Sequence, residues 1–191
     1  MPVGECERAF AAAAAVDGLV LERARVPWLN QRGHLGLPAE AGAVAETLER
    51  IFIALGGDMV EQGTKRLTPL RGDYLHAPTG TFIEIDEHQH FTSHRLQTLE
   101  LYPAGAALGF DIATYSDLCK QWRLRADRFR ASKAARGFGE GGRQPQRAYN
   151  DALRDLAVPA MGHPPVIRAA ATDGDGARAY AAVREQLAKL V

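Results

Sequence analysis

A short acidic and histidine-rich stretch, FIEIDEHQHF at residues 82–91, holds the side chains with the most chemistry in this chain. Four acids or histidines alternate along it: Glu84, Asp86, His88 and His90. Side chains at alternate positions of a β-strand lie on one face. Charged groups that enter a protein core cost free energy unless something binds them. The pattern therefore predicts a strand with an apolar face, at Ile83 and Ile85, and a second face that binds a cation.

The sequence before this strand adds a third carboxylate. APTG at residues 77–80 predicts a four-residue turn, and in that register Asp73 on the preceding strand faces Glu84. Directly opposed residues of an antiparallel pair lie about 5 Å apart on one face. Two carboxylates at that distance repel unless a cation or a shared proton lies between them. The alternative is a solvated acidic face. We favour a metal site made of Asp73, Glu84 and Asp86, and oxygen ligands suit Mg²⁺ or Mn²⁺.

The composition is that of a soluble globular domain, with 46% hydrophobic and 24% charged residues among 191. The net charge is zero, but the first 100 residues carry 14 acidic and 9 basic side chains and the remainder carries the reverse. Two cysteines make neither a disulfide framework nor a zinc site. The alanine-rich segment after residue 9 follows no basic leader, so we read it as a helix. These features favour a cytoplasmic protein without a membrane partner.

Periodicity and turn residues divide the rest of the chain into helices and strands. Helices are expected at residues 5–25, 39–55, 93–102, 112–135, 146–158 and 177–190. Strands are expected at 59–67, 70–76, 81–89 and 164–171. This order predicts an α/β fold with a mixed four-stranded sheet flanked by helices. The expected organisation is an N-terminal helical extension (1–38), a core domain (39–176) with a basic helical insertion (112–147), and a C-terminal helix (177–191).

The order and the acids resemble the PD-(D/E)XK nuclease superfamily. Its restriction-endonuclease-like αβββαβ core carries an Asp on the second strand and a Glu or Asp on the third, and Asp73 and Glu84 match these positions. IEIDEHQHFTSHR looks like the E-x-D-G-x-x-H string, with a following Arg, of the branch that contains very-short-patch-repair endonuclease relatives. The residues that match the string are Glu84, Asp86, His90 and Arg95. VIRAA resembles the last strand of that branch and carries Arg168. The resemblance covers about residues 39–170.

The resemblance implies a metal-dependent endonuclease that hydrolyses phosphodiester bonds in DNA, in repair or in defence against foreign DNA. Mg²⁺ or Mn²⁺ would be held by Asp73, Glu84 and Asp86. His90 or a second water would take the proton, and Arg95 or Arg168 would offset charge on the scissile phosphate.

The chain departs from the family pattern in two places. Asp86 stands where the superfamily has a lysine, and Glu87 replaces the glycine of the branch. Lys65 is a candidate for a migrated lysine, although a solvated strand residue is the simpler interpretation. Two alternatives stay open: a catalytically inactive module that binds nucleic acid or protein, and a transition-metal site made of His88, His90 and His94.

Residues 120–147 form the most basic segment, with a net charge of +7 in an otherwise neutral chain. Such a segment favours a phosphate backbone, so DNA is the expected partner. The predicted nucleic-acid contacts are Arg123, Arg128, Arg130, Lys133, Arg147 and Arg168. Trp122 and Phe129 would supply either stacking or core contacts. The alternative is a solvated surface on which the arginines pair with nearby acids. The sequence leaves open whether the chain forms a homodimer.

Overall fold

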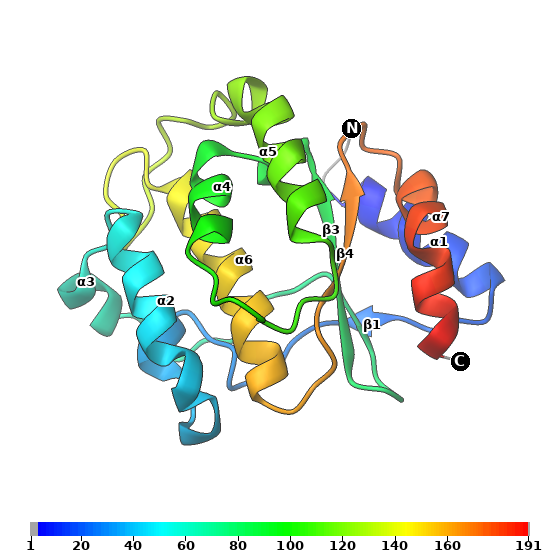
Figure 1. Ribbon diagram of the computed structural model, residues 1–191, viewed down its shortest axis with the longest axis horizontal. Coiled ribbons are helices and arrows are strands. Elements are labelled where there is room, and N and C mark those ends of the chain that lie inside the picture. The colour runs from blue at the N-terminus through cyan, green and yellow to red at the C-terminus, as the bar shows by residue number, and fades with distance from the viewer. Residues whose placement is uncertain (1–3, 191) are drawn as a thin grey trace.

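The computed structural model describes residues 4–190. These residues form an α/β sandwich in which one mixed sheet lies between two groups of helices (Figure 1). The strands are β1 (Glu22–Arg23), β2 (Tyr74–His76), β3 (Thr81–Glu87) and β4 (Ile167–Ala171). The helices are α1 (Glu5–Val16), α2 (Gly42–Ala54), α3 (Met59–Gly63), α4 (Ser93–Glu100), α5 (Ile112–Ala126), α6 (Arg143–Ala160) and α7 (Gly176–Leu187). The predicted α/β class and the mixed four-stranded sheet are confirmed.

The strands lie in the order β1-β2-β3-β4. β1, β2 and β3 pair antiparallel, and β4 joins β3 in parallel. His76 pairs with Thr81, and Tyr74 pairs with Ile83, so residues 77–80 form the predicted four-residue turn. The register that brings Asp73 toward Glu84 is therefore confirmed.

β3 lies inside the sheet, and six of its seven residues are buried. Ile83 and Ile85 contribute to a core shared with α1 and α7. The opposite face of β3 carries Phe82, Glu84 and Asp86 toward α6. Because both faces of β3 are covered, its two acids are buried rather than solvated.

α6 is the central helix of the second layer. Twelve of its eighteen residues are buried, and its Leu153 and Leu156 join a core with Leu48 and Phe52 of α2. α4 and α5 cover the same side of the sheet (Figure 1). An almost wholly buried helix that still carries charged residues must pair them inside the protein.

Several expected boundaries are wrong. Residues 59–67 do not form a strand, because Asp58 accepts a hydrogen bond from the Glu61 amide at 2.9 Å and caps α3 instead. The helix expected over 112–135 ends at Ala126, and Arg130 has a φ of 54° that no helix continues through. The helix expected over 5–25 ends at Val16, and two of the remaining residues become β1.

The terminal segments expected as extensions take part in the sandwich. α1 and α7 pack together over one face of the sheet, and β1 is its edge strand. Within residues 4–190, no helix has both the length and the apolar character needed to cross a bilayer.

Candidate metal centre

Three side chains converge beside β3 in an arrangement that suits a metal ion. Asp86, His90 and Asp151 each offer a ligand atom, and these atoms lie within 4.8 Å of one another. His90 Nδ1 is 3.2 Å from Asp86 Oδ1 and 3.0 Å from Asp151 Oδ2. Among residues 4–190, this is the one such group of His, Cys, Asp and Glu. Two carboxylates and an imidazole are ligands for Mn²⁺, Fe²⁺ or Zn²⁺.

Three different elements position the three ligands. Asp86 is on β3, His90 ends the 3₁₀ turn His88–His90 that follows it, and Asp151 comes from the middle of α6. Asp86 and Asp151 are 1% exposed, whereas the His90 side chain is 21% exposed. The cluster therefore opens toward solvent at His90.

The charges of the cluster support one another. Burial lowers the pKa of His90, but the carboxylates of Asp151 and Asp86 more than offset that, so the pKa is raised. Burial opposes ionisation of Asp151, yet His90 and Arg168 hold its pKa well below the usual range. The carboxylates of Asp86 and Asp151 thus attract a proton to His90 Nδ1. The same two carboxylates would attract a metal cation to this position.

Arg168 of β4 fixes Asp86 from the other side. Its Nη1 donates to both carboxylate oxygens of Asp86 at 2.9 Å, and Tyr115 Oη donates to Asp86 Oδ2 at 3.1 Å. Arg168 Nη2 also donates to the carbonyl of Asp151 at 3.2 Å. This fork holds the two acidic ligands in a fixed relation.

A second buried acid, Asp155, extends the network. It accepts hydrogen bonds from Arg168 Nε at 2.7 Å, from Arg95 Nη2 at 2.6 Å and from Tyr102 Oη at 2.7 Å. Arg95 and Arg168 both lie near the ring of Phe110. The two arginines are 1% and 3% exposed, so these contacts hold them inside the protein and away from an external phosphate.

Asp73 and Glu84 lie together, as the register predicts. The Asp73 amide donates to Glu84 Oε1 at 3.3 Å, and Asp73 Oδ2 accepts from the Ile85 amide at 2.8 Å. Burial and the charge of Glu84 raise the pKa of Asp73 to about 8. Burial also raises the pKa of Glu84, against the opposing effect of Arg154 and Arg168. The nearby cations therefore do not fully balance the negative charges that Asp73 and Glu84 would carry when both are ionised.

Arg154 of α6 and Gly72 define the space around Glu84. Arg154 Nε lies 3.3 Å from Glu84 Oε1, and its Nη2 donates to the carbonyl of Arg71 at 2.7 Å. A side chain at position 72 would place its Cβ 2.6 Å from Glu84 Oε1. The glycine therefore leaves room for the carboxylate beside the chain.

The basic segment reaches the open side of the cluster. Arg123, Arg128, Arg130 and Lys133 are exposed, and within residues 4–190 none of them forms an ion pair. The Phe129 ring lies 5.9 Å from the His88 ring. Arg147 Nη1 donates to the carbonyl of Gln89 at 2.9 Å, which places this cation beside His90. Trp122 and Phe129 are half-buried, and each carries an arginine over its ring, Arg125 and Arg130 respectively.

The other expected residues lie elsewhere. His88 packs near Trp122, and neither it nor His94 belongs to the group of convergent ligands, so the three histidines do not form one site. Lys65 is not the solvated strand residue that the sequence favours. It follows α3, is 7% exposed and lies over Phe138 rather than beside the acids of β3.

Sequence reasoning missed three residues, Asp151, Arg154 and Asp155, all from α6. Their spacing puts them on one face of the helix together with Arg147, since residues three and four apart are neighbours. Charges repeated on an alanine- and leucine-rich helix were the available signal, because such a helix packs against a core.

Residues 50–189 match the model of a family of unknown function, DUF7255. The chain belongs to this family. The matched region of the DUF7255 chain runs from within α2 through α7 and contains every residue of the cluster. Searches of curated proteins and of solved structures found no match.

Proposed function

We propose that this DUF7255 protein is a divalent-metal-dependent nuclease that hydrolyses phosphodiester bonds in DNA. The observation that carries the proposal is the convergence of Asp86, His90 and Asp151 beside the third strand of an α/β core. The helix, meander, helix and fourth strand expected of a PD-(D/E)XK nuclease are compatible with α1, β1 to β3, α6 and β4, but α1 and β1 precede residue 39, where the resemblance begins.

The donor set fits a metal ion. His90 Nδ1 lies about 3 Å from an oxygen of each carboxylate, which is close to the separation of neighbouring ligands around a cation with bonds of about 2 Å. One histidine among the ligands favours Mn²⁺ over Mg²⁺. Asp73 and Glu84, whose negative charge is incompletely balanced, are the candidates for a second cation position. A bound divalent cation would supply a Lewis acid for phosphodiester hydrolysis.

The chain's own residues have separate roles in this proposal. Arg168 and Tyr115 orient Asp86, and Arg168 also holds Asp151, so they are positioning residues. His90 points Nδ1 at the two carboxylates, which leaves Nε2 as its nitrogen toward solvent. With Nδ1 as the metal ligand, a neutral His90 carries its proton on Nε2, so Nε2 would donate a hydrogen bond to the substrate and a second water would take the proton.

The surroundings of the opening favour a polyanion as substrate. Arg147 lies beside the Gln89–His90 turn, and the exposed cations of residues 123–133 lack acidic partners among the described residues. Unpaired cations attract phosphates without sequence preference. This distribution supports contacts from Arg123, Arg128, Arg130, Lys133 and Arg147, whereas Arg168 acts inside the protein.

The test combines metal binding with a cleavage assay. Mn²⁺ binding is measured by calorimetry for the parent and for the variants His90→Ala, Asp151→Asn and His88→Ala, each checked for folding by circular dichroism. Cleavage of single-stranded, duplex, nicked and mismatched DNA is then followed with and without Mn²⁺. His90→Ala and Asp151→Asn should lose Mn²⁺ binding and at least 100-fold in cleavage rate. The matched control His88→Ala should retain both.

Two outcomes contradict parts of the proposal. Mn²⁺ binding by His90→Ala and Asp151→Asn at the parent's affinity would exclude the cluster as the metal site. Mn²⁺ binding without cleavage of any DNA would favour the second candidate, an inactive nucleic-acid-binding module. One observation favours this candidate. Asp86 stands where the superfamily has a lysine, and both of its carboxylate oxygens already accept hydrogen bonds from Arg168.

A further inference from the structure

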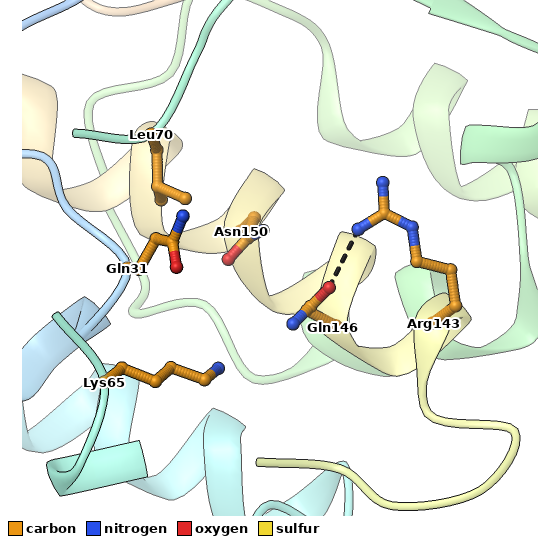
Figure 2. Close-up of a pocket in the computed structure, with 6 residues that line it drawn as sticks. All are labelled: Gln31, Lys65, Leu70, Arg143, Gln146 and Asn150. Atoms are coloured by element: carbon orange, nitrogen blue, oxygen red, sulfur yellow. Dashed lines mark hydrogen bonds between the residues drawn. The ribbon is translucent and has the colours of Figure 1, made fainter. Parts of the chain in front are cut away.

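A second polar site lies on another face of α6. It is a pocket of about 190 Å³ lined by Gln31, Lys65, Leu70, Arg143, Gln146 and Asn150 (Figure 2). Two of these residues are cationic, three carry amides, and none is acidic. Asn150 is the neighbour of Asp151 in the chain, so successive residues of α6 serve the pocket and the metal centre.

Lys65 is the central residue of the pocket. It is 7% exposed, and its ammonium group forms no hydrogen bond or ion pair with any of residues 4–190. Figure 2 shows its side chain extending into the space toward Gln146. Its Nζ lies 6.0 Å from the centre of the Phe138 ring and close to Gly137, where an added Cβ would be 3.1 Å away. Glu61 is the acid that most raises the pKa of Lys65. Its carboxylate accepts a hydrogen bond from the Gly137 amide and not from Lys65. An ammonium group without a protein acceptor keeps its three donors available for a ligand in the pocket.

Arg143 provides a second cation at the rim. Its Nη1 donates to Gln146 Oε1 at 2.8 Å, and its buried Nε has no protein acceptor among the described residues. The side-chain amide of Asn150 likewise makes no hydrogen bond within residues 4–190. Lysine, arginine and amide groups together offer many donors that converge on one space.

We propose that this pocket binds a phosphate group. Two cations match the charge of about −1.5 to −2 that a phosphate monoester carries at pH 7, whereas a carboxylate carries only one charge. The volume suits a small anion and its hydration rather than a drug-sized ligand, for which about 300 Å³ is the lower limit. The phosphate comes either from a free small molecule or from the end of a nucleic-acid strand. The proposal does not rest on nuclease activity.

The test is a titration of metal-free protein with inorganic phosphate, followed by calorimetry and by thermal unfolding. Sodium chloride of equal ionic strength and sodium acetate serve as reference salts. The parent should bind phosphate and not acetate. Lys65→Met should weaken phosphate binding at least tenfold, because it removes a charged donor while keeping the shape of the side chain. Lys65→Met should also be at least as stable as the parent without phosphate, so loss of binding cannot be assigned to unfolding.

Matched variants separate this site from other cations and from the metal centre. Lys120→Met removes an exposed lysine that pairs with Asp117, and it should bind phosphate as the parent does. Asp151→Asn should also keep phosphate binding, so the pocket can fail or succeed independently of the proposed nuclease. Competition by a short strand with a 5′-phosphate, but not by the same strand with a 5′-hydroxyl, would identify the strand end as the source. Competition by neither would identify a free phosphate.

Two results would overturn the proposal. One is equal affinity of Lys65→Met and the parent for phosphate. The other is acetate binding as tight as phosphate binding, since the charge match would then have no effect.

Discussion

At the scale of single residues, the face of β3 toward α6 gathers more negative than positive charge. The carboxylates are Asp73, Glu84, Asp86, Asp151 and Asp155, and the guanidinium groups are Arg95, Arg154 and Arg168. Asp151 and Asp86 raise the pKa of His90 against the effect of burial, and burial together with the charge of Glu84 raises the pKa of Asp73 to about 8. A metal cation would neutralise the surplus of negative charge.

Asp73→Asn should change how stability depends on pH in metal-free protein. The pKa of Asp73 is raised to about 8, so the folded chain binds this proton more tightly than the unfolded chain. The resulting stability is complete below about pH 4 and is lost as pH rises through about 8. The stability of Asp73→Asn relative to the parent should therefore increase from about pH 5 to about pH 9. Urea unfolding with a chelator present measures it.

Asp117→Asn is the control for that experiment, because Asp117 is exposed and, among residues 4–190, its ion-pair partner is Lys120 alone. Its stability relative to the parent should stay constant over the same range. A constant difference for Asp73→Asn as well would mean that Asp73 ionises normally.

Asp155→Ala should destabilise the protein strongly. Asp155 accepts from the buried Arg95 and Arg168 and from Tyr102, and its removal leaves two guanidinium groups with fewer partners. Breaking a buried ion pair in this way costs about 3–5 kcal/mol. Denaturant unfolding should show this loss, and Asp117→Ala should leave stability nearly unchanged. A loss below about 1 kcal/mol would show that the network relaxes or admits water.

The sequence predicts the part of the site that depends on local strand pairing, but not the part that depends on long-range packing. The neighbourhood of Asp73 and Glu84 follows from one turn and the strand period, which are local features. Asp151 lies 61 residues after His90, and only tertiary packing brings α6 to β3. A charged helix face ordinarily indicates solvent, so the alanine and leucine residues among the charges of α6 were the signal that this helix packs against a core.

At the scale of elements, strong local signals produced the confirmed boundaries. The helix predicted over 93–102 corresponds to α4, where Thr92 accepts from the Arg95 amide at 3.0 Å and Pro103 follows the end. The segment 59–67 was misread because its apolar residues, Met59, Val60 and Leu67, show no strand alternation, and the helix cap of Asp58 starts α3 there. Three apolar residues in a short segment do not decide between helix and strand.

The segment at the end of α5 should govern binding to nucleic acid. A variant with Arg123→Glu, Arg128→Glu and Arg130→Glu removes three exposed cations that lack acidic partners in the described chain. Each phosphate contact contributes about −0.9 to the slope of log K against log salt on duplex DNA. The triple variant should flatten that slope by up to about 2.7 and weaken binding alike across sequences. Fluorescence anisotropy at several salt concentrations measures both quantities.

Arg178→Glu provides the control for that variant. Arg178 is an exposed cation of α7, on the other side of the sheet, and pairs with Asp173. Its reversal should leave the salt slope unchanged. An unchanged slope in the triple variant would mean that the basic segment is a solvated surface. Mn²⁺ binding should survive in both variants, since neither touches the cluster.

At the scale of the whole molecule, the prediction captured the sheet and its helices but misplaced the first strand. β1 has only two residues, Glu22 and Arg23, and both are exposed. No hydrophobic pattern can mark so short and polar a strand, and its place is set by pairing with Leu75 and Tyr74. Consequently α1, expected in an extension, covers the sheet jointly with α7.

The contact between α1 and α7 provides a test of this architecture. Gly176 begins α7, and a Cβ atom there would lie 1.9 Å from the carbonyl oxygen of Cys6 and 2.7 Å from the amide nitrogen of Phe10. Both atoms belong to the backbone of α1, so no rotamer change can relieve the contact. Gly176→Ala should therefore separate the two helices and destabilise the protein by about 1–3 kcal/mol or more.

Gly42→Ala is the matched control, because Gly42 begins α2 with a helical φ of −57° and nothing lies within 4 Å of the added carbon. Alanine at that position should be neutral or stabilising by up to about 1 kcal/mol. Urea unfolding compares the two variants with the parent. Folded Gly176→Ala should still bind Mn²⁺, since α1 and α7 lie across the sheet from Asp86 and Asp151. Equal stability of Gly176→Ala and the parent would refute the close packing of the terminal helices, and with it the place of α1 in the sandwich.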